Sequence, residues 1–354
     1  MKQVFLLEYK IHSHIFSLKT KLFIRVRFTL LFAFLLFTFT SFAQITEDEN
    51  RFFSRLNSTG GLPEKLLNTR TIVFHTYTLS QKELENIQQT FQRTGIDAVG
   101  YFESDYLFAG KDVFIALADY LNKREITNLI FIQKKDAGFT AYATVFNTKA
   151  TLVEENQYAW YAQDKILSEL LLKLYRTAAN SLKKQNLLIN EFPETGLTVN
   201  PIQGRRNDFF AIDLKVDPIA IPKFGDEKLD KELEEIFKSY PYKYKLTEPG
   251  LSEKELRKQG YYYVLSFVHA RAKVAKTVLG YDMTKAESAF VSVTYPGSQP
   301  ALKNYSADTP VYKFYIKHID SQNVFLGTKW DADITTYQAL VNHLQGFKIE
   351  LRIN

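Results

Sequence analysis

The stretch Leu79-Ser80-Gln81-Lys82-Glu83-Leu84 decides how the first half of the chain is interpreted, because it predicts where a helix begins. Ser80 can accept a hydrogen bond from the free backbone N–H groups of the first helical turn, and Glu83 can reach back to the N–H of Ser80. The two flanking leucines can close a hydrophobic staple. The apolar run 71–74 reads as a buried strand, so the motif predicts a strand followed by a capped helix.

Outward from this motif, strands and helices alternate along the chain. A strand is expected at 98–102 and a helix at 112–123. A hairpin is expected over 128–146 and a long helix over 158–184. This alternation is typical of an α/β layer arrangement. We therefore predict an α/β domain over residues 69–185.

The second half of the chain contains more strand-like segments. A stretch punctuated by Pro and Gly, 186–207, is predicted to be a linker. Beyond it, apolar and aromatic runs predict several strands, among them 273–281 and a final strand at 347–353. We interpret 208–354 as an α+β domain. The chain is thus expected to contain two domains, each a mixed sheet packed with helices.

The opening motif has an echo in the second half, Leu251-Ser252-Glu253-Lys254-Glu255-Leu256. Each copy is followed by a glycine, Gly95 or Gly260, and then by a strand-like segment. One interpretation is duplication of a single α/β unit. The other is that both halves contain a well-capped helix, because good caps resemble one another. A matching strand order in the two halves would support duplication.

The first 43 residues have the three parts of a secretory signal peptide. Basic residues precede an uncharged apolar run, 28–39, and small residues occupy both positions that a signal peptidase reads. The apolar stretch is shorter than the roughly 20 residues that a membrane-spanning helix needs. We expect cleavage before Gln44, a periplasmic or secreted mature protein, and an irregular arm over 44–68.

Removal of this leader changes the charge of the protein. The leader holds six basic residues and one acidic residue, so the formal net charge falls from +6 to +1. A nucleic-acid-binding protein needs a clustered excess of Lys and Arg, which the remaining chain lacks. The chain has no cysteine, so neither disulfides nor a lipid-bearing cysteine can form. We expect no further membrane-spanning segment.

The sequence contains no strong catalytic or metal-binding motif, so no metal or cofactor is expected. Two acidic pairs are the candidates for chemistry. Asp331 and Asp333, beside Trp330, could bind a cation or act as an acid–base pair; the alternative is that they begin the next helix. Glu103 and Asp105 fall in a strand-to-helix loop, where α/β proteins often bind ligands; the alternative is a solvated loop.

Tyrosines cluster in the second half between residues 240 and 263. Tyr261 and Tyr263 are the candidate contact residues. Tyrosine offers a large contact surface with a polar tip, which suits binding to a protein or a glycan. The alternative is that these residues reflect strand propensity on a half-exposed sheet.

Residues Val311 to Gly327 predict a hairpin with a polar turn at Asp320-Ser321-Gln322. This pattern resembles the carboxy-terminal hairpin of a broad family that includes the TolB amino-terminal domain, the penicillin-binding-protein activator LpoB and the curli-secretion lipoprotein CsgG. The resemblance covers roughly the last 150 residues and, more faintly, 70–150. It implies a non-catalytic α/β module of the cell envelope. The lipid-bearing cysteine of LpoB and CsgG is missing, so a membrane tether is not implied.

These observations lead to one hypothesis and one rival. The hypothesis is an exported, non-catalytic cell-envelope protein that binds another protein or serves as an accessory factor. The rival is a secreted hydrolase that uses the carboxylates of one acidic pair. Paired carboxylates that face each other in a deep pocket would favour the hydrolase.

Overall fold

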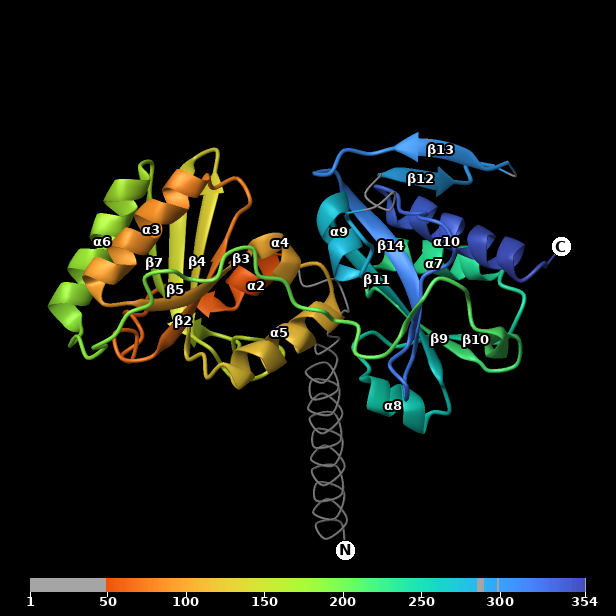
Figure 1. Cartoon of the computed structure of the whole chain (residues 1–354). Coiled ribbons are helices and arrows are strands. Elements are labelled where there is room, and N and C mark those ends of the chain that lie inside the picture. Colours follow the sequence, from red (N-terminus) through yellow and green to blue (C-terminus); the bar gives the residue numbers. More distant parts are fainter. Residues whose placement is uncertain (1–48, 285–289, 298, 354) are drawn as a thin grey trace, which may run out of the picture. The chain divides into compact units, whose positions relative to one another are not determined.

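The computed structural model describes residues 49–284, 290–297 and 299–353. The predicted signal peptide and its cleavage site lie outside these residues. Residues Gln44–Asn354 group into one compact unit. The structure confirms mixed sheets packed with helices (Figure 1), while the division into two domains stays a prediction. We call residues 49–184 the N-terminal half and 206–353 the C-terminal half.

The N-terminal half is built on a five-stranded sheet with the order β3-β2-β4-β5-β7. Strand β2 pairs in parallel with both β3 and β4, whereas β5 is antiparallel to β4 and β7 is antiparallel to β5. A separate small pair joins β1 to β6. The strands are β1 (Leu56–Asn57), β2 (Arg70–His75), β3 (Asp97–Glu103), β4 (Asn128–Lys135), β5 (Gly138–Val145), β6 (Gln157–Tyr158) and β7 (Trp160–Asp164).

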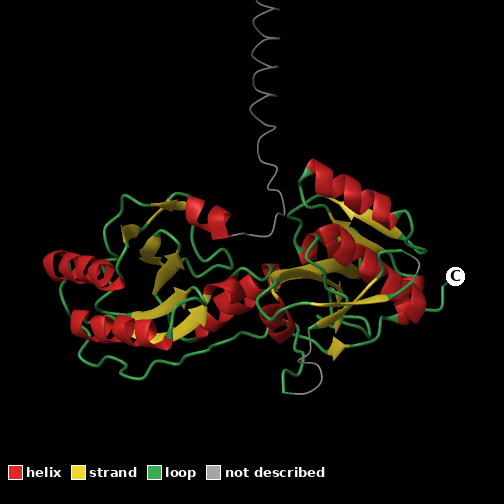
Figure 2. Ribbon diagram, turned by 90° about the horizontal axis from the view of Figure 1, so that it is seen from above, coloured by secondary structure: helices red, strands yellow, loops and turns green. Residues whose placement is uncertain are grey.

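Helices cover both faces of this sheet (Figures 1 and 2). Val73 of β2 packs in the cluster of α3 and α6, whereas its neighbours Ile72 and Phe74 pack in the cluster of α2 and α5. Such alternation is expected of a strand that is buried on both faces. The helices are α2 (Glu49–Ser54), α3 (Gln81–Thr94), α4 (Ser104–Leu107), α5 (Lys111–Lys123) and α6 (Leu167–Ser181).

The C-terminal half contains a six-stranded sheet with the order β10-β9-β11-β14-β15-β8. The predicted hairpin within 311–327 is confirmed, because β14 and β15 pair antiparallel. Gln322 in its turn has a left-handed backbone, with a φ of 58°. The strands are β8 (Arg206–Asn207), β9 (Ile219–Pro222), β10 (Tyr244–Thr247), β11 (Tyr263–Arg271), β14 (Pro310–His318) and β15 (Val324–Phe325), and a separate sheet pairs β12 (Val291–Thr294) with β13 (Ala301–Asn304).

Helices again line both faces of the six-stranded sheet. Helices α7 and α10 contribute to one hydrophobic cluster on the first face, and α8 and α9 contribute to two clusters on the other. In the described part of the chain, no helix has the length and apolar character needed to cross a membrane. The helices are η1 (Ile212–Lys215, a 3₁₀ turn), α7 (Glu227–Phe237), α8 (Glu253–Lys258), α9 (Ala272–Val278) and α10 (Thr336–Glu350).

The two halves repeat one topology. Each contains a repeated unit that runs strand, helix, strand, helix, strand, then two antiparallel strands and a closing helix. The other elements are additions to this unit: α2, β1, α4, β6, β8, η1, α9, β12 and β13. Strands β2, β3, β4, β5 and β7 correspond in order and direction to β9, β10, β11, β14 and β15. The first and closing helices share one face in both halves. A matching strand order is the observation that would support the duplication interpretation over the alternative of two similar caps.

Both predicted capping boxes are present, but they occupy positions that do not correspond. Ser80 and Glu83 begin α3, which links the first and second strands of its half. Ser252 and Glu255 begin α8, which links the second and third strands. The sequence echo therefore reflects two similar caps, and the repeat is carried by the strand order.

The arm expected over 44–68 is not irregular in its described part, because it contains α2 and β1. Three expected elements were also wrong. The helix expected over 158–184 begins with β7, which adds to the sheet beside β5, and only then continues as α6. The strand expected at 273–281 is helix α9, because its buried apolar residues follow a helical spacing. The strand expected at 347–353 belongs largely to α10, because Phe347 continues the buried stripe of Leu340 and Leu344 at helical intervals.

Candidate functional site

Asp331 of the first acidic pair forms a buried ion pair. Its Oδ1 lies 2.7 Å from the Nζ of Lys313 on β14. The same Nζ donates a hydrogen bond of 2.6 Å to the carbonyl oxygen of Leu326. On the other side, Nδ1 of His343 on α10 lies 3.4 Å from Oδ2 of Asp331. All three ionisable side chains are buried, so this carboxylate faces partners from its own chain.

The electrostatics of this cluster keep Asp331 ionised. Burial raises the pKa of Asp331, but the Lys313 ammonium and His343 outweigh that effect, and the pKa lies below its usual value. Burial lowers the pKa of Lys313 and is partly offset by Asp331. Burial also lowers the pKa of His343, so this imidazole is neutral at pH 7. The cluster therefore holds the Asp331 carboxylate against the Nζ of Lys313, with a neutral imidazole on its other side.

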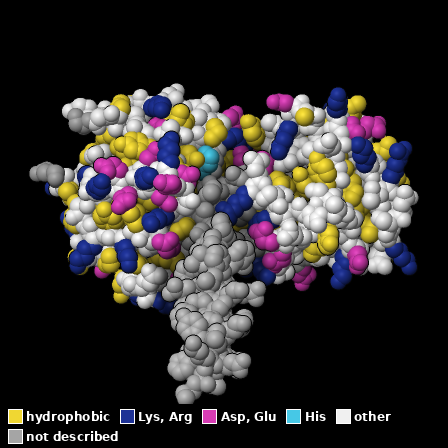
Figure 3. Space-filling model, turned by 180° about the vertical axis from the view of Figure 1, so that it is seen from behind, with side chains coloured by type: hydrophobic (Ala, Val, Ile, Leu, Met, Phe, Trp, Pro, Cys, Tyr) yellow, Lys and Arg dark blue, Asp and Glu magenta, His cyan; other side chains and the backbone are white. Residues whose placement is uncertain are grey.

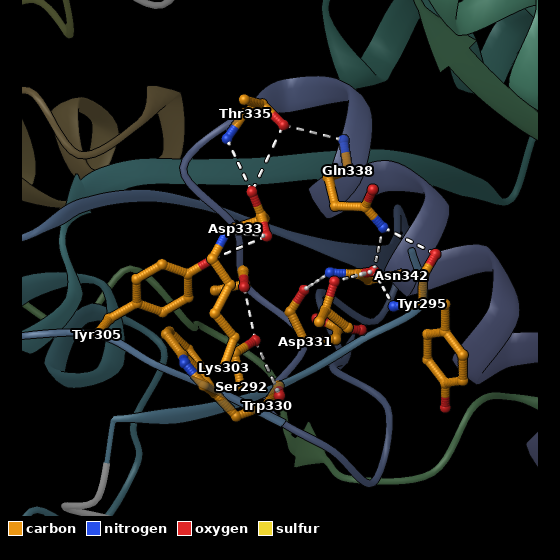
Figure 4. Close-up of polar contacts among 12 residues, drawn as sticks. Ser292, Tyr295, Lys303, Tyr305, Trp330, Asp331, Asp333, Thr335, Gln338 and Asn342 are labelled. Atoms are coloured by element: carbon orange, nitrogen blue, oxygen red, sulfur yellow. Dashed lines mark hydrogen bonds and ion pairs between the residues drawn. The ribbon is translucent and has the colours of Figure 1, made fainter. Parts of the chain in front are cut away.

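Asp333 points to different partners, as Figure 4 shows. Its Oδ2 accepts a hydrogen bond of 2.8 Å from the hydroxyl of Tyr305 and lies 3.3 Å from the Nζ of Lys303. Its Oδ1 accepts a hydrogen bond of 3.2 Å from the backbone N–H of Thr335, the residue that caps α10. Asp331 and Asp333 thus have separate sets of partners, and Asp333 supports the start of a helix.

Asn342 of α10 fixes the backbone around the two aspartates (Figure 4). Its Oδ1 accepts a hydrogen bond of 2.8 Å from the backbone N–H of Tyr295, and its Nδ2 donates one of 3.1 Å to the carbonyl oxygen of Asp331. Ser292 of β12 donates a hydrogen bond of 2.6 Å to the carbonyl oxygen of Ala332. The segment is therefore held between β12 and α10 by buried polar contacts.

Glu103 and Asp105, the second acidic pair, converge on Arg271 at the end of β11. The guanidinium Nη2 lies 2.5 Å from Oε2 of Glu103, and Nε donates to Asp105. A third carboxylate, Asp308, lies 2.8 Å from Nη1. The ring of Tyr77 lies 3.8 Å from the guanidinium carbon. The structure thus brings the pair together, around a cation from the other half.

The charge of Arg271 is secured by these carboxylates. Burial lowers the pKa of Arg271, but its hydrogen bonds and charge contacts with Asp105, Asp308 and Glu103 raise the pKa by more than burial lowers it, so the net shift is upward. Burial has the largest effect on the pKa of the nearby His75 and lowers it, although the negative charges of Glu103 and Asp105 act to raise it. This cluster joins β3 and α4 to β11 through charge-assisted hydrogen bonds.

The aromatic candidates lie inside the protein. Tyr261 and Tyr263 are buried in hydrophobic clusters on the two faces of the six-stranded sheet. Tyr262, between them, is the more exposed residue, and Arg257 lies 3.9 Å from its ring centre. Trp330 is also buried, with its ring 4.9 Å from the Nζ of Lys276. The two candidate tyrosines and Trp330, the aromatic candidate beside the first acidic pair, therefore contribute to the core.

The partners of the acidic residues could not be found from local spacing. Arg271 is separated from Glu103 by 168 residues, and only the fold brings them together. For Lys313 the sequence did contain a weaker indication of a buried partner. Lys313 and Lys317 interrupt an otherwise apolar strand and, four residues apart, lie on the same face of it. Charged residues at the inward positions of a strand indicate buried partners elsewhere in the chain.

Comparison of the chain with protein-family models, with curated proteins and with solved structures finds no match. Within the described residues, no group of three or more His, Asp or Glu side chains could hold a metal ion. The site is therefore interpreted from its geometry. Each carboxylate of the two acidic pairs is engaged by an Arg, Lys, Tyr or Thr of the same chain.

Proposed function

We propose that this chain is an exported, non-catalytic protein of the cell envelope that acts by binding another protein. The observation that carries the proposal is the engagement of both acidic pairs by cations and hydroxyls of the chain itself. A general acid or base must reach a substrate and exchange a proton with it. Carboxylates that are engaged in internal ion pairs and hydrogen bonds are poorly suited to that task, which favours binding over hydrolysis.

The distribution of charge supports a protein partner. Figure 3 shows Lys and Arg side chains interspersed with Asp and Glu over the displayed face, without a large area of one sign. Nucleic-acid-binding surfaces are instead clustered and basic. The leader-like first 43 residues support export, and the hairpin of β14 and β15 agrees with the resemblance to envelope modules.

Export is tested on the full chain produced in its source cells with a carboxy-terminal affinity tag. Cell fractions and the amino-terminal sequence of the purified protein are determined. We expect the tagged protein in the envelope or the medium, with Gln44 as its first residue. A purified protein that keeps residues 1–43 and stays in the cytoplasm would contradict this part of the proposal.

Binding is tested by cross-linking the tagged chain in living cells, identifying the co-purified protein, and titrating the two purified proteins in a calorimeter. We expect a saturable complex of defined stoichiometry. The hydrolase is tested in parallel with ester, glycoside and peptide substrates. Turnover that Glu103→Gln or Asp331→Asn abolishes, while the circular dichroism spectrum is retained, would overturn the proposal.

A further inference from the structure

The segment between the two halves covers one sheet edge in each of them. We call residues 185–207 the connector. In the N-terminal half it lies along β3, where the N–H of Tyr101 donates to the carbonyl of Glu194 at 2.8 Å and the N–H of Glu194 donates to that of Val99 at 3.1 Å. The bridge between Gly100 and Glu194 is parallel. In the C-terminal half its end forms β8, which pairs in parallel with β15.

The strand that corresponds to β3 in the C-terminal half is β10. Both are the second strand of the repeated unit, and both lie at the sheet edge beside its first strand, β2 or β9. The connector covers β3, but the sheet order ends at β10, and no strand in the described residues pairs with its outer side. The repeat therefore shows, within one molecule, the same edge once covered by an extended segment and once open.

The outer edge of β10 offers backbone groups for pairing. The carbonyls of Lys243 and Thr247 accept hydrogen bonds from the N–H groups of Ile219 and Lys223, so they point toward β9. Backbone groups of successive residues in a strand point to opposite sides. The N–H and C=O groups of Leu246, and likewise those of Tyr244, therefore point away from the sheet.

The charge beside this edge is positive. Lys243 and Lys245 are exposed, and neither forms an ion pair with any residue that the structure describes. Both lie on the sheet face opposite Tyr244 and Leu246, whose side chains pack against the core. The connector carries Glu191 and Glu194, and Glu194 forms the bridge to β3. A segment with acidic residues thus already covers the corresponding edge, β3, within this chain. A segment of the same kind would also complement the charge of the two lysines beside β10.

The other edge of the five-stranded sheet, β7, is less suited to pairing. Just before β7, the N–H of Ala159 already donates to the carbonyl of Asn57 at 2.9 Å. Near its end, the Nζ of Lys173 donates to the carbonyl of Gln163 at 2.7 Å. Side-chain and backbone groups of the chain thus already occupy part of this edge, whereas β10 has no such contacts among the described residues.

We propose that β10 binds an extended acidic segment of a partner protein as an added strand. The inference rests on the proposed function, protein binding, and specifies its surface and the class of its partner. The outward backbone groups of Tyr244 and Leu246 supply the hydrogen bonds, and Lys243 and Lys245 select carboxylates over cations. Lysines on an edge strand also protect proteins against aggregation, and the experiment below separates the two roles.

The probe is a fluorescently labelled synthetic peptide of alternating Glu and Val, and its counterpart replaces each Glu by Lys. Binding to the purified full chain is followed by fluorescence anisotropy, and hydrogen exchange reports the protection of backbone amides. We expect the Glu peptide to bind at least 10-fold more tightly than the Lys peptide. We also expect it to protect the amides of Tyr244 and Leu246. Equal affinity for both peptides, or protection elsewhere only, would refute the edge site.

Two variants test the same edge independently. Leu246→Pro removes an outward N–H while the bonds to β9 remain, and should weaken binding of the Glu peptide at least 10-fold. Lys243→Glu with Lys245→Glu should reverse the preference between the peptides. The control, Lys65→Glu with Lys135→Glu, makes the same charge change on exposed lysines of the N-terminal half and should leave the preference unchanged. Thermal unfolding checks that each variant is folded.

The outcome with the natural partner separates this inference from the proposed function. If the cross-linked partner still binds Leu246→Pro and the double Lys→Glu variant with wild-type affinity, protein binding stands and the β10 site is wrong. If no partner is recovered in cells, the proposed function fails. Peptides that bind only as aggregates, judged by light scattering, would show that the lysines serve protection alone and would overturn the inference.

Discussion

The two halves share a strand order but differ in what they bury. Among the described residues of the N-terminal half, Arg55 is the only Lys, Arg, Asp or Glu whose side chain is buried. The C-terminal half buries a larger set, which comprises Arg271, Lys276, Lys313, Lys317, Asp331 and Asp333. The same topology can therefore enclose an apolar interior or one that contains ion pairs. The difference shows that topology sets the layers, while individual side chains set how each interior is stabilised.

The halves also differ in what completes the second face of each sheet. In the N-terminal half, α2 inserts Phe52 among Phe108, Phe114 and Phe131. In the C-terminal half, Ala109, just before α5, and Val113 in its first turn join the cluster around α9. The first addition precedes the repeated unit of its own half, and the second comes from the other half of the chain. Four predictions test these differences between the halves.

The largest effect is expected for Asp331→Ala. This change leaves the Lys313 ammonium buried without its carboxylate, which costs about 3–5 kcal/mol in the free energy of unfolding. Urea denaturation of the full chain measures the loss. The double change Lys313→Met with Asp331→Leu removes both charges and should recover much of the stability. If the double variant is no more stable than Asp331→Ala, the buried charge is not the cause.

Phe52→Ala should have the next largest effect. It removes a fully buried ring that packs against Phe108, Phe114 and Phe131, at a cost of about 3 kcal/mol. The neighbouring Phe53→Ala is the matched control, because that ring is only partly buried and should cost less. Equal losses for the two variants would show that α2 does not complete the second face.

The stability of both halves should fall in mild acid. Burial lowers the pKa of His343 and of His75 below the ordinary value of 6.5, so the unfolded chain binds protons more readily than the folded chain. Stability is therefore full above pH 6.5 and is lost as the pH falls toward the lower folded-state values. Each histidine contributes a slope of up to about 1.4 kcal/mol per pH unit.

The two histidines can be separated by substitution. His343→Leu and His75→Leu should each flatten the fall in urea midpoint between about pH 7 and pH 5, since each removes one proton-binding group that the folded state excludes. The comparison of the two slopes tells which half unfolds first in acid. Curves that stay parallel to that of the wild-type protein would contradict the assignment.

The smallest effects concern the two capping boxes. Ser80→Ala and Ser252→Ala should each cost about 1 kcal/mol, because both hydroxyls accept from a backbone N–H at the same distance, 3.3 Å. Thermal unfolding measures both. Similar losses are expected, because the two caps are alike even though α3 and α8 do not correspond in the repeat. A negligible loss for either would show that its helix start is held by other contacts.

Much of the fold could be predicted from local sequence. The capping box at Ser80, the alternation of strands and helices, and the hairpin around Gln322 are all present in the structure. The helix α9 and the end of α10 were missed, because short apolar runs satisfy both a strand and a helix pattern. Which pattern prevails depends on the surface against which the run is packed.

The acidic pairs were identified from sequence, but their partners were not. Glu103 and Asp105 stand together in the chain, whereas Arg271 lies 168 residues beyond Glu103. The ion pair of Lys313 with Asp331 likewise depends on the segment after β15 passing β14. Such contacts have no local signature, because spacing along the chain carries no information about distant segments.

The sequence alone indicated the mixed α/β content, the positions of the caps and the expectation of export. The contacts between distant segments were needed to learn that the halves repeat one strand order, that the acidic residues face cations of the chain, and that no described strand pairs with the outer side of β10. The reason is physical. Local hydrogen bonds and hydrophobic periodicity act over a few residues, whereas burial and charge pairing depend on which distant segments fold against each other.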